Sequence, residues 1–205
     1  MIEKVRSLQL KAFLWRESLS ALYKIGLCFG MALCTGLLAG MRVPLAFTPV
    51  PITGQVLGVL LSGIFLGRFY GGLSMVIYLL LGLSGIPWFK GWSIISFSAF
   101  FANPTSGYLI GFIFASLFIG SQVDRKIKNR FLLPQLRLML LGVLIIYIFG
   151  ASYLFFLTRV SFSKIFIMAI LPFIPGDLFK AFLAAGISAS FLPKMSYNGE
   201  IDKRL

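Results

Sequence analysis

The chain has 205 residues, of which 59% are hydrophobic and only 12% are charged. Soluble domains carry roughly 45–50% apolar and about 25% charged residues, so this composition excludes an ordinary soluble domain and indicates a membrane protein. The net charge of +13 comes from 19 Lys and Arg against 6 Asp and Glu. Because these cations lie between long apolar runs, they indicate membrane topology and contacts with lipid headgroups, and no nucleic-acid partner is expected.

Six apolar runs follow a mixed-polarity N-terminal segment that covers residues 1–18. Each run is predicted to be a transmembrane helix, because a lone strand cannot satisfy its backbone hydrogen bonds in lipid. The runs cover residues 19–40, 52–67, 71–86, 105–121, 137–157 and 165–192, and the last is interrupted by Pro172 and by Pro175-Gly176. The expected fold is therefore an all-α six-transmembrane-helix bundle over residues 19–192, followed by a C-terminal tail over residues 193–205.

The distribution of cations orients this bundle. With six spans, the N-terminus, the turn after the second run, the loop after the fourth run and the C-terminus share one side. That side holds Lys4, Arg6, Lys11, Arg16, Lys24, Arg68, Arg125, Lys126, Lys128, Arg130, Arg137, Lys194, Lys203 and Arg204, and the opposite loops hold only Arg42, Lys90, Arg159 and Lys164. The positive-inside rule then predicts a multi-pass membrane protein with both termini in the cytoplasm.

The two external connections over residues 41–55 and 86–104 are long, apolar and rich in Pro or aromatic residues. Long apolar loops usually pack as lids or line a cavity. For Trp88, a place in an aromatic belt at the membrane interface is an equally good interpretation.

Asp177 and Lys180 lie inside the sixth apolar run, whereas the other five acids lie in predicted cytoplasmic segments. Ionisable groups at membrane depth are costly and are functional candidates. Their i, i+3 spacing places them on one helical face, and Pro175-Gly176 just before them is expected to break and restart the helix, as in transporter binding sites. This pattern predicts a small ligand of mixed polarity, with Lys180 facing a carboxylate and Asp177 accepting from ligand N–H groups. The structural alternative is that Asp177 caps the new helix and Lys180 pairs with it.

Weaker polar signals flank the same external region. Asn103, Thr105 and Tyr108 begin the fourth run, and Thr48 and Thr53 precede or enter the second. These side chains are candidates for the same cavity, although Asn and Thr also cap helices.

Small residues recur in the first run at Gly26, Gly30, Ala32, Gly36 and Gly40. Such spacing lets two helices approach closely. It fits either packing within the bundle or a docking face for another membrane protein, and the sequence does not separate the two.

The sequence lacks the usual marks of catalysis. It contains no histidine, no G-x-x-x-x-G-K-[ST] phosphate-binding loop and no H-E-x-x-H or G-x-S-x-G motif. We therefore expect no catalytic residue, no metal site and no cofactor, and we expect no ATP hydrolysis by the chain itself.

Three segments together resemble the BioY family, the biotin-specific S-component of energy-coupling-factor (ECF) transporters. Residues 44–55 resemble its Pro-rich entry to the second helix, residues 78–89 with 103–112 its central motif, and residues 172–185 its last-helix signature. The motifs occur in the order of the family, and the likeness extends from about residue 20 to residue 192.

This resemblance implies a six-helix protein of the bacterial cytoplasmic (inner) membrane that captures biotin at the external face for uptake. Uptake would be powered through a transmembrane coupling subunit (EcfT-type) and ABC ATPases. By motif position it implies ligand contacts at Asp177 and Lys180 and weaker candidates at Asn103, Thr105, Tyr108, Thr48, Thr53 and Trp88. It also places the docking of the coupling subunit at the small residues of the first helix. An S-component for another small vitamin, a membrane-embedded lipid-modifying enzyme and a channel are the alternatives; sparse polar residues along the spans disfavour the channel.

Overall fold

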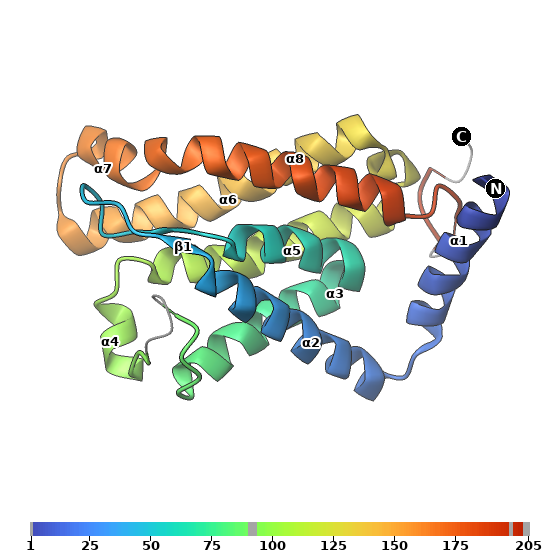
Figure 1. Ribbon diagram of the computed structural model, residues 1–205, viewed down its shortest axis with the longest axis horizontal. Helices are drawn as coiled ribbons and strands as arrows, with labels where there is room; N and C mark the ends of the chain where they lie inside the picture. Colours follow the sequence, from blue (N-terminus) through green and yellow to red (C-terminus); the bar gives the residue numbers. More distant parts are fainter. Residues whose placement is uncertain (1, 90–93, 197–198, 203–205) are drawn as a thin grey trace.

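The computed structural model describes residues 2–89, 94–196 and 199–202, and it is almost entirely helical (Figure 1). In chain order the elements are α1 (Ile2–Ser18), α2 (Ala21–Gly40), β1 (Arg42–Val43), β2 (Ile52–Thr53), α3 (Gln55–Leu83), α4 (Phe97–Phe101), α5 (Ser106–Arg125), η1 (Ile127–Arg130), α6 (Leu132–Thr158), α7 (Phe162–Ala169), η2 (Leu171–Phe173) and α8 (Ile174–Phe191). The cations Lys90, Lys203 and Arg204, which entered the topology prediction, lie outside the described residues.

Within the described ranges, α2, α3, α5 and α6 are each long and apolar enough to cross a membrane, and the bent pair of α7 and α8 qualifies as a fifth span. Helix α3 contains two of the predicted helices, because residues 55–66 and 68–83 meet at Gly67, where φ is 78° and ψ is −173°. A Cβ placed on Gly71 would lie 2.9 Å from the Cα of Gly63, so the two halves fold back onto each other. In Figure 1 the chain runs toward the right along the first half and returns along the second. Counted in this way, the structure contains the six predicted helices.

The last predicted helix is broken, as Pro172 and Pro175 indicated. Helix α7 ends at Ala169, the 3-10 turn η2 contains Pro172, and α8 starts at Ile174 with Pro175 in its first turn. The axes of α7 and α8 differ by 52°. Proline lacks a backbone N–H and is tolerated in the first turn of a helix, where that N–H would have no intrahelical acceptor.

Helix α1 forms where the sequence analysis expected only a polar segment. It lies across the end of the bundle (Figure 1) and buries Phe13 and Arg16. Arg16 donates from Nη1 to the carbonyl oxygen of Phe65 at 3.0 Å, and Gln9 donates to the carbonyl oxygen of Ser190 at 2.5 Å. These two contacts hold α1 against α3 and α8.

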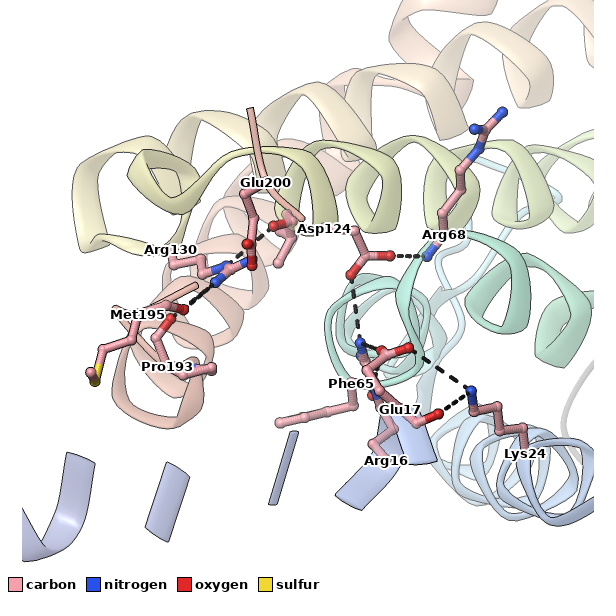
Figure 2. Close-up of polar contacts among 11 residues, drawn as sticks. Arg16, Glu17, Lys24, Phe65, Arg68, Asp124, Arg130, Pro193, Met195 and Glu200 are labelled. Atoms are coloured by element: carbon pink, nitrogen blue, oxygen red, sulfur yellow. Dashed lines mark hydrogen bonds and ion pairs between the residues drawn. The ribbon is translucent and has the colours of Figure 1, made fainter. Parts of the chain in front are cut away.

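The C-terminal tail is held by a buried ion pair between Glu200 and Arg130, the last residue of η1. Arg130 and Glu200 are 0% and 2% exposed, and Nη2 of Arg130 lies 2.5 Å from Oε1 of Glu200. The same guanidinium donates to the carbonyl oxygens of Pro193 and Met195 (Figure 2). Asp202 accepts from the backbone N–H groups of Ile127 and Lys128 at 2.7 and 3.0 Å, so the tail caps η1.

The core lies where α3, α5 and α6 pack together. Within it, the hydroxyl oxygens of Ser62 on α3 and Ser116 on α5 are 2.7 Å apart, so two polar groups in an apolar interface satisfy each other. Helix α1 and the end of α8 lie at one end of the bundle, and α4, the β1–β2 hairpin and α7 lie at the other (Figure 1). Which end faces the cytoplasm stays a prediction from the distribution of cations.

We predict that Gly67→Ala destabilises the fold by about 1–3 kcal/mol, because only glycine tolerates this backbone conformation. The added Cβ would also lie 2.6 Å from Oδ2 of Asp124. Gly186→Ala is the matched control, since nothing lies within 4 Å of its Cβ position and alanine favours the helix. Thermal unfolding in detergent measures the stability of both variants. A Gly67→Ala protein as stable as Gly186→Ala would contradict the prediction that the turn requires glycine.

We predict that Asp202→Ala lowers stability by about 1 kcal/mol at neutral pH, the usual value of a capping side chain. Desolvation raises the pKa of Asp202, but the N–H groups of Lys128 and Ile127 outweigh it and hold that pKa below its usual value of 3.8. A carboxyl whose pKa is lower in the folded state stabilises above its unfolded pKa, and the effect fades as pH falls through the folded value. The difference between wild type and variant should therefore be present at pH 7 and shrink below pH 3.8, as unfolding midpoints across this range would show.

Candidate functional site

A cavity of about 690 Å³, measured with its open mouth, lies at the end of the bundle opposite α1. It is formed by the end of α2, the segment that leads into α3, the first turns of α5 and α8, and the middle of α6. Its apolar lining consists of Ala39, Val50, Pro51, Ile52, Val56, Phe89, Leu109, Phe112, Ile146 and Phe173, and its polar lining of Thr53, Gln55, Thr105, Tyr108, Tyr147, Asp177 and Lys180.

The charged group of the cavity is the pair of Asp177 and Lys180 in α8. Nζ of Lys180 lies 2.7 Å from Oδ1 of Asp177, and the hydroxyl of Tyr147 donates to Oδ2 at 2.7 Å. Asp177 is only 4% exposed, and these two contacts give each of its carboxylate oxygens a partner inside the protein. A buried carboxylate needs such partners, because desolvation of an unpaired charge is expensive.

The break between α7 and α8 places this pair at the cavity. Asp177 lies in the first turn of α8, whose N-cap residue, Phe173, provides no side-chain cap. The first N–H groups of a helix lack intrahelical acceptors and carry a positive partial charge, which favours an anion at this position. The described hydrogen bonds of the Asp177 side chain go to Tyr147 and Lys180, which is not the geometry of a simple cap.

Five of the predicted ligand-binding residues line the cavity together: Asp177, Lys180, Thr53, Thr105 and Tyr108. The hydroxyls of Thr53 and Thr105 donate to Gln55 and Asn103, at 2.8 and 3.0 Å. The hydroxyl of Tyr108 donates to the carbonyl oxygen of Ala169 at 2.6 Å and thereby joins α5 to the end of α7. Among the lining residues, only Lys180 is a cation, with N–H groups beyond the one directed at Asp177.

The other three predicted residues lie outside the cavity lining and have structural contacts. Asn103 accepts from the N–H and hydroxyl of Thr105, and Thr48 donates to the carbonyl oxygen of Met168 at 2.7 Å. Trp88 is buried, so it belongs to no exposed aromatic belt. Its ring stacks on Tyr78 with centroids 5.0 Å apart and packs on Gly36 of α2.

The sequence analysis missed Tyr147, although the two tyrosines within the apolar run of α6, Tyr147 and Tyr153, were a usable signal. It also left Gln55 and Phe89 out of the site. Gln55 donates to the hydroxyl of Tyr78 at 2.5 Å, so its amide links the cavity wall to the core. Phe89 forms part of the apolar lining of the cavity.

The structure separates the predicted docking residues of α2. Ala32 and Gly36 are buried, Gly40 is half-buried, and Gly36 has Trp88 directly against it. Gly26 and Gly30 lie on the exposed side, with nothing within 4 Å of their Cβ positions. Only these last two can meet another protein without repacking of the bundle.

Comparison with known proteins identifies the family. The BioY family matches residues 11–197, nearly the whole chain. The chain belongs to the BioY family. It is 39% identical over 149 residues to a probable biotin transporter BioY of Methanothermobacter thermautotrophicus, covering 69% of this chain and 94% of the relative. It is 38% identical over 149 residues to the biotin transporter BioY of Rhizobium etli, covering 70% and 78%.

A solved structure, the S-component for biotin from an ECF-type ABC transporter, superposes with a TM-score of 0.74 at 29% identity and covers 84% of this chain and 93% of that one. These findings confirm the BioY resemblance and the six-helix S-component fold. They also make the chain a multi-pass protein of the cell membrane that belongs to a family of transporter components and not of enzymes.

We predict that Tyr147→Phe lowers stability by about 1.5–3 kcal/mol, the usual cost of losing a hydrogen bond to a charged group. Tyr153→Phe is the control on the same helix, because it also loses one hydroxyl, which donates to the carbonyl oxygen of Phe101 at 2.8 Å. That neutral bond should cost only about 1 kcal/mol. Denaturant titration in detergent compares the two, and equal losses would show that the Asp177 carboxylate does not depend on Tyr147.

Proposed function

We propose that this chain binds biotin in the cavity at the head of α8 and acts as the substrate-capturing component of an ECF-type biotin uptake system. The observation that carries the proposal is the Asp177–Lys180 pair, which is the only charged group among the residues that line an otherwise mostly apolar cavity. Membership of the BioY family and the similarity to the S-component for biotin support the choice of ligand.

The chemistry of biotin matches the cavity. Its ureido ring places N–H donors beside a carbonyl acceptor, and Asp177 and Lys180 place an acceptor beside a donor, with 2.7 Å between Oδ1 and Nζ. We assign Asp177 to a ring N–H and Lys180 to the ring carbonyl, because the pair is already joined and presents both groups together. This assignment replaces the expected contact between Lys180 and the carboxylate of the ligand.

The apolar lining takes the rest of the ligand. Val56, Leu109, Phe112 and Ile146 offer hydrocarbon to the thioether ring and the aliphatic chain, and burial of apolar area contributes roughly 25 cal/mol per Å². The polar groups of the cavity are held by hydrogen bonds before the ligand arrives, so little ordering is required on binding.

The proposed direction of capture follows from the two ends of the bundle. The cavity lies opposite the end that carries α1 and the tail, and the positive-inside rule assigns that end to the cytoplasm. The cavity would then take biotin from outside the cell.

Energy for release must come from other proteins, because the sequence contains no phosphate-binding loop for ATP. We propose that an EcfT-type coupling subunit, which works with ABC ATPases, docks on the outer side of α2. Gly26 and Gly30 leave room for close approach there, beside the exposed Leu22, Leu33 and Leu37.

We predict that Asp177→Asn and Lys180→Ala each weaken binding of labelled biotin to the purified protein by about 10- to 150-fold, the value of one hydrogen bond to a charged group. Lys164→Ala is the control, since this exposed lysine of α7 lies outside the cavity and its loss should leave affinity unchanged. Folded wild-type protein that binds no biotin, or that binds another small vitamin in preference, would overturn the proposed ligand.

The amide of the biotin carboxyl group tests the assignment of Lys180. If Lys180 meets the ureido carbonyl, Lys180→Ala weakens biotin and biotin amide by the same factor. If Lys180 meets the carboxylate instead, wild type discriminates against the amide and Lys180→Ala loses that discrimination.

A further inference from the structure

Helix α1 exposes a continuous apolar and basic face at the end of the bundle. Leu8 and Trp15 are 58% and 60% exposed, and Lys11 and Ala12 between them are exposed as well. At i, i+3, i+4 and i+7 these four residues share one side of the helix. Phe13 and Arg16, which are buried, lie on the side that faces the bundle.

Contacts at the turn in the middle of α3 hold α1 in this orientation. Arg16 donates to the carbonyl oxygen of Phe65, just before the turn at Gly67, and pairs with Glu17 and with Asp124 at 3.7 Å. Asp124 in turn accepts from the backbone N–H of Arg68 at 2.8 Å (Figure 2). The outer face of α1 is therefore presented by a fixed helix.

The length of the linker fixes the depth of α1. Only Leu19 and Ser20 separate the end of α1 at Ser18 from the start of the membrane-spanning α2 at Ala21. Two extended residues span about 7 Å, so the end of α1 lies within that distance of the first turn of α2. Helix α1 lies across the end of the bundle (Figure 1), so the short linker keeps it beside the start of the first candidate span, where phospholipid headgroups are expected.

The electrostatic balance of this end selects the class of lipid. Exposed cations here are Arg6, Lys11, Arg68, Arg125 and Lys128. Among the side chains that the structure describes at this end, the acids are engaged within the protein: Glu17 by Arg16, Asp124 by the N–H of Arg68, Glu200 by Arg130, and Asp202 by the N–H groups of η1. The surface is therefore strongly basic and attracts anionic headgroups.

We propose that α1 is an interfacial anchor, with Leu8 and Trp15 inserted at the headgroup–acyl boundary and Lys11 bound to anionic phospholipid. An amphipathic helix of this kind lies in the plane of the interface, and tryptophan prefers that depth. The anchor goes beyond ligand capture and uses no residue of the cavity.

A nitroxide label at Leu8→Cys tests the proposal in the full-length protein, with Cys34→Ser removing the exposed native thiol. The protein is placed in phosphatidylcholine vesicles with or without phosphatidylglycerol, and collisions of the label with oxygen and with a water-soluble nickel chelate report its depth. The same label at Lys128→Cys, exposed on η1, is the aqueous reference. We expect the Leu8 label to favour oxygen over nickel relative to that reference, and more so with phosphatidylglycerol.

Lys11→Glu in the Leu8-labelled protein is the charge test. It should shift the label toward water in vesicles that contain phosphatidylglycerol and leave its depth unchanged in phosphatidylcholine alone. A Leu8 label as accessible to nickel as the Lys128 label would overturn the proposed anchor. A label depth that changes neither with phosphatidylglycerol nor with Lys11→Glu would overturn the proposed binding of anionic lipid. Because the vesicles contain neither biotin nor another protein, these outcomes do not depend on the proposed function.

Discussion

A charged side chain in the hydrocarbon region has no water to solvate it, so its partners must come from the protein itself. In this chain the break between α7 and α8 places Asp177 and Lys180 where they can be partners for each other. It supplies a helix start at membrane depth, places Asp177 in the first turn and Lys180 one turn further, and leaves Tyr147 of α6 within hydrogen-bond distance. The pair forms the charged part of the cavity lining, and apolar residues of the neighbouring helices form most of the rest.

The sequence predicted the features that depend on local chemistry. Apolar runs indicated the helices, and Pro172 and Pro175 indicated the break. The two charges in an apolar run indicated the charged part of the cavity lining. It did not predict Tyr147 as a partner of Asp177, since the two residues come from different helices and pairing between helices is set by packing. Helix α1 also escaped prediction, because its one buried face is narrow and depends on Arg16 reaching a carbonyl 49 residues away.

The small residues of α2 also show that the sequence alone does not predict which face of a helix packs inside the bundle. Their spacing was equally consistent with internal packing and with docking, and the structure divides them between the two: Ala32 and Gly36 face the core, and Gly26 and Gly30 face outward. Trp88 connects the inner set to the cavity, because it packs on Gly36 while the next residue, Phe89, lines the cavity wall. Two consecutive residues thus join the helix proposed to dock a partner to the chamber proposed to hold the ligand.

The buried pair of Arg130 and Glu200 has a consequence for the life of the protein in the cell. Glu200 lies 70 residues after Arg130 in the chain, yet it neutralises a guanidinium that is completely enclosed. A copy whose chain stops before Glu200 would retain an enclosed cation without its counter-charge. The fold at that end therefore depends on a residue that is synthesised after α8, and copies that lack Glu200 would be exposed to the proteases that survey the membrane.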